Sequence, residues 1–236
     1  MNSQSEQQPY AIVIGLESIV GLQTARILGA HGVPVIGITD DPRAFCCRTN
    51  ACERIIPTPD GDDGLIRALE DLAPEMSQSP VLYPCTDMTV LQISRHRERI
   101  EDYYHVVLPP LDVVETLMDK VNFYEYAQKL GLSIPKTFFL REREDVERAA
   151  EQLSFPCILK PPTKTSEWLS KAKVGVYKIA TADEFRELYD ICEGWAETLM
   201  IQEWIDGSDG NLFSCNCYFN EVSEPIVCLL YTSDAA

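Results

Sequence analysis

The chain has 236 residues, of which 45% are hydrophobic, so it can bury a core as one large domain or as two smaller ones. Its 20 lysines and arginines against 37 aspartates and glutamates give a formal net charge of −17. A phosphate backbone would repel so acidic a chain, which excludes nucleic acid as an expected partner.

Cysteine usage and the amino terminus indicate the environment. The nine cysteines lack paired metal-ligand spacing, which fits neither a disulfide framework nor a zinc site and favours a reduced, cytoplasmic protein. We interpret Cys215 and Cys217 as small core residues. Residues 1–9 lack the basic and apolar regions of a signal peptide, and no apolar run approaches about 18 residues. We therefore expect a soluble protein with no membrane partner.

The first elements predict a parallel sheet. Residues 10–14 and 33–38 are apolar strands, and a helix from Gly21 to near Gly32 connects them. The first strand ends at Gly15, but the glycines do not form the G-x-G-x-x-G dinucleotide fingerprint. After the second strand, Asp40 lies where a ribose-binding acid would lie, with Asp41 beside it. Turn formation before Pro42 is the favoured interpretation of both aspartates.

The next segment continues this pattern, with strands at 54–56, 81–83 and 106–108 and a helix at 65–72. A further helix runs to about residue 102, with Thr86 or Asp87 as its cap. Both residues therefore lie at the carboxyl edge of the sheet, where open α/β sheets bind ligands. Two interpretations stay open, a substrate contact and plain helix capping, and capping is favoured.

The pattern changes at residue 111, where we place a domain seam. A helix running to Gly131 is followed by strands and helices of an α+β unit. Thr181 and Glu184 form a capping box for its last helix. The strands are predicted at 134–140, 157–160, 174–179 and 199–205, the helices at 146–153 and from Thr181 to Cys192, and two later strands at 211–219 and 226–231.

Lys160 ends a short apolar strand immediately before two prolines, which stop strand pairing. A lysine at such a strand end needs an anion, because a desolvated, unpaired ammonium costs several kcal/mol. Phosphate is one partner, and a carboxylate or solvent is the alternative. Lys120 lies near the start of a helix, where the macrodipole disfavours a cation, so a bound phosphate there would relieve a local conflict.

Three motifs follow one another at similar spacing. They are Asp119-Lys120 with Phe123, then Lys160 in the sequence FPCILKPP, then residues 201–207, IQEWIDG. Together they resemble the ATP-grasp superfamily, of the carboxylate–amine ligase type. The resemblance implies an α/β protein in which residues 1–110 form a Rossmann-like pre-ATP-grasp domain with a parallel sheet. A partial α+β ATP-grasp domain would follow, with its first subdomain at 111–207 and the truncated start of a second at 208–236.

The resemblance also implies the roles of single residues. Lys120 and Lys160 would hold ATP, the Glu203 carbonyl and the Ile205 N–H would bind adenine, and Gln202 would touch it with its side chain. Asp209 matches the ribose-binding acid of the superfamily, with a turn aspartate as the equal alternative. The loop at 161–174 departs from the glycine-rich pattern of the superfamily. Its lysines would still cover phosphates, and the preferred contact is Lys173, which we place at the start of the next strand; the others are Lys164 and Lys171.

The implied function is an ATP-dependent carboxylate–amine ligase that uses ATP and Mg²⁺, forms an acyl phosphate and joins a small-molecule carboxylate to an amine. The resemblance is compatible with a homodimer of the full-length form. The metal-binding acids and catalytic arginine of the superfamily are not in this chain, so we expect an inactive, poorly soluble fragment. The rival interpretation is a non-catalytic Rossmann-like domain that binds a dinucleotide or metabolite through Gly15, Asp40 and Asp87.

Overall fold

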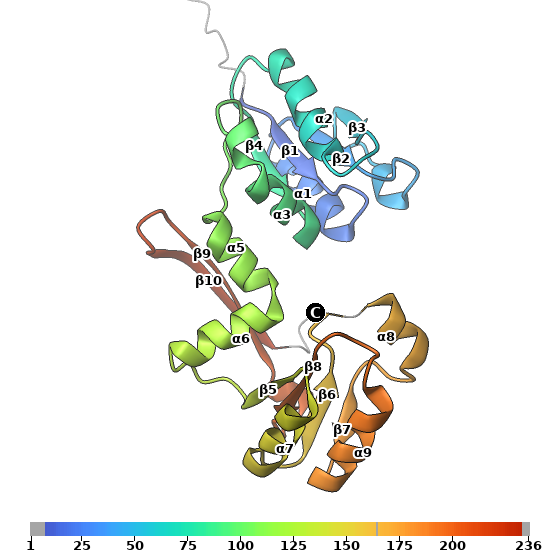
Figure 1. Ribbon diagram of the computed structural model, residues 1–236. Coiled ribbons are helices and arrows are strands. Elements are labelled where there is room, and N and C mark those ends of the chain that lie inside the picture. Colours follow the sequence, from blue (N-terminus) through green and yellow to red (C-terminus); the bar gives the residue numbers. More distant parts are fainter. Residues whose placement is uncertain (1–7, 164, 233–236) are drawn as a thin grey trace, which may run out of the picture. The chain divides into compact units, whose positions relative to one another are not determined.

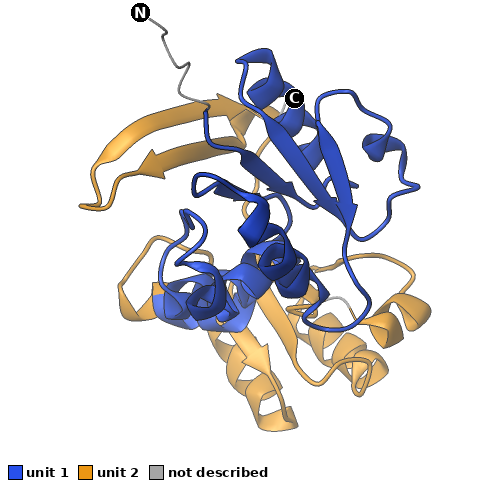
Figure 2. Ribbon diagram, turned by 90° about the horizontal axis from the view of Figure 1, so that it is seen from above, with its two compact units in different colours: residues 1–126 blue, residues 127–236 orange. Residues whose placement is uncertain are grey.

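The structure is a computed structural model that describes residues 8–163 and 165–232. Its contacts divide the chain into two compact units, residues 1–126 and residues 127–236 (Figure 2). The predicted domain limits at residues 110 and 207 stay a prediction. No helix in the described ranges is both long enough and apolar enough to span a membrane.

Unit 1 contains a four-stranded parallel sheet with the order β3-β2-β1-β4 (Figure 1). The chain runs outward from β1 to β3 and then returns to place β4 on the other side of β1. The point where strand order reverses therefore lies between β1 and β4. The elements are β1 (Ala11–Ile14), α1 (Ile19–Ala30), β2 (Val35–Thr39), β3 (Arg54–Pro57), α2 (Gly64–Leu72), β4 (Val81–Pro84), α3 (Asp87–Arg95), α4 (Arg97–Ile100), α5 (Leu111–Met118) and the first residues of α6 (Lys120–Lys129).

Both faces of this sheet are buried, which explains why its central strands are apolar without alternation. On one face, Ile12 packs in a core with Leu69 of α2 and Ile93 of α3. On the other face, Val13 packs with Ala25 of α1. The predicted α/β class with a parallel sheet is confirmed.

Three predictions for this part of the chain are wrong. Residues 106–108 do not form a strand, because the pairing stops at an isolated bridge between Val81 and His105. Pro109 and Pro110 follow closely and lack backbone N–H donors, so the segment can form few strand hydrogen bonds. The single helix predicted from residue 111 to Gly131 is broken at Asp119, whose backbone is extended (φ −88°, ψ 118°). Similarly, the helix after β4 is interrupted at His96, between α3 and α4.

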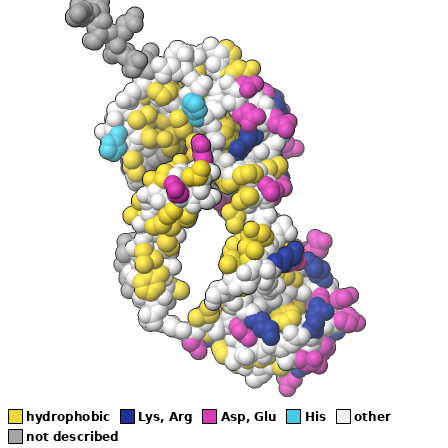
Figure 3. Space-filling view, turned by 90° about the vertical axis from the view of Figure 1, so that its left-hand side faces the viewer, with side chains coloured by type: hydrophobic (Ala, Val, Ile, Leu, Met, Phe, Trp, Pro, Cys, Tyr) yellow, Lys and Arg dark blue, Asp and Glu magenta, His cyan; other side chains and the backbone are white. Residues whose placement is uncertain are grey.

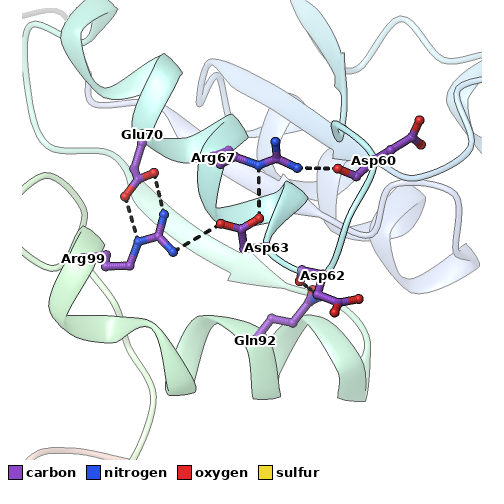
Figure 4. A network of polar contacts seen from close by, with 7 residues as sticks. All are labelled: Asp60, Asp62, Asp63, Arg67, Glu70, Gln92 and Arg99. Carbon is purple, nitrogen blue, oxygen red and sulfur yellow. Dashed lines mark hydrogen bonds and ion pairs between the residues drawn. The ribbon is translucent and has the colours of Figure 1, made fainter.

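An ion-pair network joins the helices of unit 1 on their exposed side (Figure 4). Arg99 on α4 binds Glu70 through two hydrogen bonds of 2.9 and 2.8 Å and lies 3.5 Å from Asp63. Asp63 also pairs with Arg67 at 3.1 Å. The Arg99 guanidinium lowers the pKa of the Glu70 carboxyl, chiefly through these hydrogen bonds. These pairs link α2 to α4 across the surface.

Unit 2 contains an antiparallel four-stranded sheet with the order β5-β8-β6-β7 and a separate two-stranded hairpin. This confirms the predicted mixture of α/β and α+β parts. The elements are the end of α6, β5 (Thr137–Leu140), α7 (Arg143–Gln152), β6 (Cys157–Lys160), α8 (Ser166–Lys171), β7 (Tyr177–Ile179), α9 (Ala182–Cys192), β8 (Leu199–Glu203), β9 (Phe213–Phe219) and β10 (Pro225–Thr232).

Helices α7 and α9 cover one face of this sheet (Figure 1). The core between them includes Leu159 of β6, Ile201 of β8, Val146 of α7 and Phe185 of α9, all fully buried. Helix α9 begins where predicted, and the Thr181 side chain accepts a hydrogen bond from the Glu184 N–H. The Glu184 carboxylate accepts from the Ala180 N–H and not from that of Thr181, so only half of the predicted capping box forms.

The segment 161–174 differs from the predicted polar loop. Thr165 caps the short helix α8, accepting a hydrogen bond from the Trp168 N–H at 3.2 Å. The Trp168 side chain is fully buried against Trp195 and Tyr177. Burial of this indole stabilises helix α8. The lysines and hydroxyl residues of the segment are typical of a loop, so its composition did not predict the helix. The next strand begins at Tyr177, so the prediction that Lys173 starts it is wrong.

On the face in Figure 3, lysine and arginine side chains lie among aspartates and glutamates and form no continuous basic patch in the part of the chain drawn in colour. Ion pairs also join α7 and α9, for example Arg186 with Glu147 at 2.8 Å, and Arg186 pairs with Asp183 at 3.1 Å.

Candidate functional site

The face of the unit 2 sheet opposite α7 and α9 carries the polar residues of the candidate site. Strand register places Thr137, Gln202, Ile158 and Lys178 side by side in one row across the sheet. Because directly opposite residues of antiparallel strands point to the same face, these side chains share a surface. Gln202 and Thr137 are buried, whereas Lys178 is exposed.

Lys160 belongs to the same face, two residues beyond Ile158 on β6 and opposite Met200 of β8. Its side chain is half-buried, at the last position of the strand. The buried residues Pro161 and Pro162 follow and end the pairing. The sequence prediction that Lys160 sits where a strand ends is therefore confirmed, while the prediction of its phosphate contact remains a proposal.

The Gln202 side chain is held in place across the sheet. Its amide nitrogen donates a hydrogen bond of 2.8 Å to Thr137 Oγ1, and the Thr137 hydroxyl donates one of 2.8 Å to the Pro135 carbonyl. Within the described residues this is the one hydrogen bond of the Gln202 side chain, so its amide oxygen is left for a ligand.

Strand β8 leaves the sheet after Glu203. The Glu203 N–H donates to the Lys136 carbonyl at 3.0 Å, and the Trp204 N–H donates to the Pro156 carbonyl at 2.9 Å. The Glu203 carboxylate accepts from the Ser154 N–H at 2.9 Å, on the face away from Gln202. Ile205 is 72% exposed, and its N–H makes no hydrogen bond within the described residues. Its backbone donor can therefore serve a ligand.

Two contacts beside this linker were not predicted from the sequence. The Lys178 ammonium lies 4.1 Å from the centroid of the Trp204 ring, and the Trp204 indole N–H donates to Asp206 at 2.7 Å. A cation over the face of tryptophan is attracted by the ring quadrupole. The register of the strands brings Lys178 near the linker. The spacing of these residues in the sequence does not predict the contact.

The lysines of the segment after Lys160 do not act alike. Lys171 forms an ion pair of 2.7 Å with Glu167 on α8. Lys173 is exposed, and its backbone N–H donates to the Tyr177 hydroxyl at 3.3 Å. The third predicted contact, Lys164, lies outside the described residues.

Two other predicted residues belong to elements outside this sheet. Lys120 belongs to unit 1, where it is the exposed first residue of α6. Asp119 caps that helix by accepting a hydrogen bond of 2.9 Å from the Asn122 N–H. Asp209 begins a short 3-10 helix, Asp209–Asn211, and its side chain lies outside what the structure describes.

The carboxyl edge of the unit 1 sheet holds the predicted substrate residues. Thr86 caps α3, and its hydroxyl and that of Thr89 each accept a hydrogen bond from the other residue's N–H. Asp87, the first residue of α3, is exposed. Gly15 ends β1 with a φ of +85°, and a side chain there would lie 3.1 Å from the Thr86 methyl group. The turn after β1 and the start of α3 therefore approach closely.

The aspartates after β2 already have partners. Asp41 accepts from the Arg43 N–H at 3.0 Å, as a turn aspartate does, and Asp40 accepts from the Thr58 hydroxyl at 2.6 Å. Sequence reasoning missed Glu17, whose carboxylate accepts from the Thr39 hydroxyl at 2.7 Å. In the described part of the chain, no group of three or more histidine, cysteine, aspartate or glutamate side chains could hold a metal ion.

Comparison with known proteins shows which class of protein this chain resembles. No protein-family profile matches the sequence. The D-aspartate ligase of Enterococcus faecium (strain Aus0004) is 32% identical over 182 residues, which cover 71% of this chain and 42% of that protein. A D-alanine–D-alanine ligase of Stutzerimonas stutzeri (strain A1501) is 28% identical over 109 residues, covering 46% of this chain and 32% of that protein. The chain thus spans less than half the length of these curated relatives.

Among solved structures, the ADP complex of an N5-carboxyaminoimidazole ribonucleotide synthetase superposes with a TM-score of 0.65. It is 13% identical, and the match covers 95% of this chain and 53% of that one. Fold and relatives agree, and the resemblance to the ATP-grasp superfamily is confirmed. Within that class, the relatives found include ligases that carry D-amino acids in their names.

Proposed function

We propose that the protein is an ATP-dependent carboxylate–amine ligase. Nucleotide would bind on the face of the unit 2 sheet opposite α7 and α9, with magnesium accompanying the phosphates of ATP. The observation that carries the proposal is the placement of Lys160 and Gln202 on one sheet face, next to a linker whose Ile205 N–H is unbonded within the described residues. The curated ligase relatives support the same reading.

Each predicted residue has a role in this proposal. Lys160 neutralises a phosphate, because a charge-assisted hydrogen bond to an ammonium contributes about 1.5 to 3 kcal/mol. Lys120 and Lys173 add positive charge near the phosphates. The Gln202 amide, the Glu203 carbonyl and the Ile205 N–H bind the adenine edge, and Asp209 binds the ribose.

The reaction we propose is transfer of the ATP γ-phosphoryl group to a substrate carboxylate. The resulting acyl phosphate is then attacked by an amine, with release of phosphate and ADP. The protein would contribute positioning and charge neutralisation. An amino acid supplies one of the two substrates, which the name of the D-aspartate ligase relative favours. Thr86 and Asp87 would contact it at the edge of the unit 1 sheet.

Magnesium fits the described protein residues poorly, since they contain no group able to hold a metal ion. We therefore assign it to the nucleotide phosphates and derive no further step from it. The expectation that this chain is an inactive portion of a longer ligase remains part of the proposal. Its support is that the match covers 42% of the D-aspartate ligase.

The rival Rossmann-like function is less well supported. Asp40 would have to bind a ribose, yet its carboxylate already accepts the Thr58 hydroxyl. Gly15 allows the turn after β1 to approach Thr86 closely. Its presence is therefore explained by the fold and does not require a bound dinucleotide.

Calorimetric titration of the chain with MgATP, MgGTP and NAD tests the binding proposal. We expect ATP to bind and NAD not to bind. The catalytic proposal is tested separately on the full-length protein by measuring ADP release with single D- and L-amino acids plus an amine. Binding of NAD in preference to ATP would establish the rival function.

A further inference from the structure

Three cysteine thiols lie together on the β9–β10 hairpin. Cys217 of β9 is directly opposite Cys228 of β10, and their sulfur atoms are 2.7 Å apart. Cys215, two residues earlier on β9 and therefore on the same face, places its sulfur 3.4 Å from that of Cys217. All three cysteines are exposed, contrary to the sequence interpretation of Cys215 and Cys217 as core residues.

The other thiols of the described chain have different surroundings. Cys46, Cys47, Cys157 and Cys192 are buried, and Cys85 contacts a hydroxyl and a carbonyl oxygen. Burial raises the pKa of the Cys157 thiol to about 11, which keeps it protonated and unreactive. The hairpin thiols differ from these, because their sulfur atoms contact one another.

The strand geometry suits a disulfide between the opposed pair. Directly opposite residues of antiparallel strands have Cα atoms about 4.5 to 5.5 Å apart. A disulfide needs a Cα separation of about 4.4 to 6.8 Å, so neither strand has to move far. A metal site is not supported, because no group of three or more histidine, cysteine, aspartate or glutamate side chains in the described part of the chain could hold a metal ion.

We propose that Cys217 and Cys228 form a reversible cross-strand disulfide in which Cys215 is the exchanging third thiol. With glutathione disulfide as oxidant, a hairpin thiolate attacks one of its sulfurs, forms a mixed disulfide and releases a glutathione thiolate. The second hairpin thiol loses its proton and attacks the mixed disulfide, which releases a second glutathione. Two hairpin thiols are oxidised, one glutathione disulfide is reduced, and the protons leave with the two glutathione thiols.

The sulfur contacts determine which thiols can react with each other. Cys228 lies 2.7 Å from Cys217, so whichever of the two forms the mixed disulfide with glutathione has the other thiol within reach to close the cross-strand bond. Cys215 can reopen the finished disulfide by attacking Cys217, its neighbour at 3.4 Å.

The test uses the reduced 236-residue chain, equilibrated with glutathione buffers from fully reduced to fully oxidised. Acid quenching, alkylation and digestion without reductant are followed by mass spectrometry. We expect one intrachain cross-linked peptide joining Cys217 and Cys228, both in the unchanged chain and in Cys215→Ser. Cys228→Ser should lose it, while Cys52→Ser, altered far away in the sequence, should keep it.

A second measurement tests whether the proximity of the two thiols depends on the folded hairpin. Phenylarsine oxide bridges two adjacent thiols, and Cys215→Ser removes the Cys-x-Cys pair that could bind it in an unfolded chain. In this variant the reagent should protect Cys217 and Cys228 from alkylation in the native state but not in 6 M urea, a condition of roughly complete unfolding for a small domain. Free, alkylated Cys217 and Cys228 in oxidised buffer would overturn the proposal, as would cross-links distributed among the nine cysteines. Disulfides formed only between chains would also overturn it.

Discussion

The Gln202 amide nitrogen donates to Thr137 Oγ1 at 2.8 Å, across the β8–β5 pair of the unit 2 sheet. This hydrogen bond orients a buried amide so that its oxygen remains for a ligand that donates. Adenine donates from its exocyclic amino group, whereas guanine has an acceptor at the corresponding position. The preference for ATP over GTP should therefore depend on this pair of side chains.

Lys160→Ala should weaken ATP binding by at least tenfold. The variant removes a charge-assisted contact worth about 1.5 to 3 kcal/mol, and one tenfold step corresponds to about 1.4 kcal/mol. Lys160→Arg should also lose affinity, because a planar fork does not replace a compact ammonium. Isothermal titration calorimetry measures both. Lys171→Ala is the matched control, since that lysine is occupied by Glu167, and its affinity should stay unchanged. Equal affinities for Lys160→Ala and the unchanged chain would remove Lys160 from the site.

Ile205→Pro should abolish adenine recognition while Ile205→Ala preserves it. Proline deletes the backbone N–H, and alanine only shortens the side chain. Ile205 is 72% exposed, so neither change should disturb the core. The measurement is the ratio of ATP to GTP affinity, with circular dichroism to show that the variants are folded. A proline variant with the ATP affinity of the alanine variant would show that the linker does not read adenine.

Continuous apolar runs made the buried strands predictable, because strands such as β1 and β2 are covered on both faces. Lys160 was found for a related reason, since two prolines mark the end of its strand. Helix α8 was missed because one buried side chain, Trp168, stabilises six residues that otherwise have the composition of a loop. The contact of Lys178 with Trp204 depends on register between strands distant in sequence, and no local pattern encodes it.

Trp168→Ala should destabilise unit 2 by about 3 to 5 kcal/mol, as expected for removing a large buried aromatic side chain. Trp168→Phe should cost less. The indole N–H is buried without a hydrogen-bond partner in the described residues, so phenylalanine removes an unsatisfied donor along with part of the ring. Urea unfolding monitored by circular dichroism gives both values. A larger loss for phenylalanine than for alanine would contradict the packing argument.

Acid should weaken the α2–α4 surface through Glu70. Arg99 lowers the pKa of this carboxyl below its ordinary value of 4.5, so the stabilisation is present above that pH and is lost as pH falls through the lowered pKa. The melting temperature of Glu70→Gln should therefore fall less between neutral pH and pH 4 or lower than that of the unchanged chain. The effect should be small and sensitive to salt, because the pair is exposed. Glu101→Gln, which alters an exposed carboxylate with no ion pair in the described residues, should behave like the unchanged chain.

Thr137→Val should both destabilise unit 2 and reduce the preference for ATP over GTP. The substitution keeps the shape of the side chain but leaves the buried Gln202 amide without its acceptor, which costs about 1 to 3 kcal/mol. Thr137→Ser retains the hydroxyl and should retain most of the nucleotide preference. Gln202→Leu in the Thr137→Val background removes the unsatisfied amide, so urea unfolding should show part of the stability restored.

The double variant separates the structural role of this pair from its role in binding. If Gln202 touches adenine, restoring stability with leucine does not restore discrimination, because the amide oxygen is gone. Calorimetry with ATP and GTP should then give similar affinities for the stabilised double variant. If the double variant instead recovers the ATP preference of the unchanged chain, the Thr137–Gln202 pair serves packing alone, and adenine is recognised by the linker backbone without it.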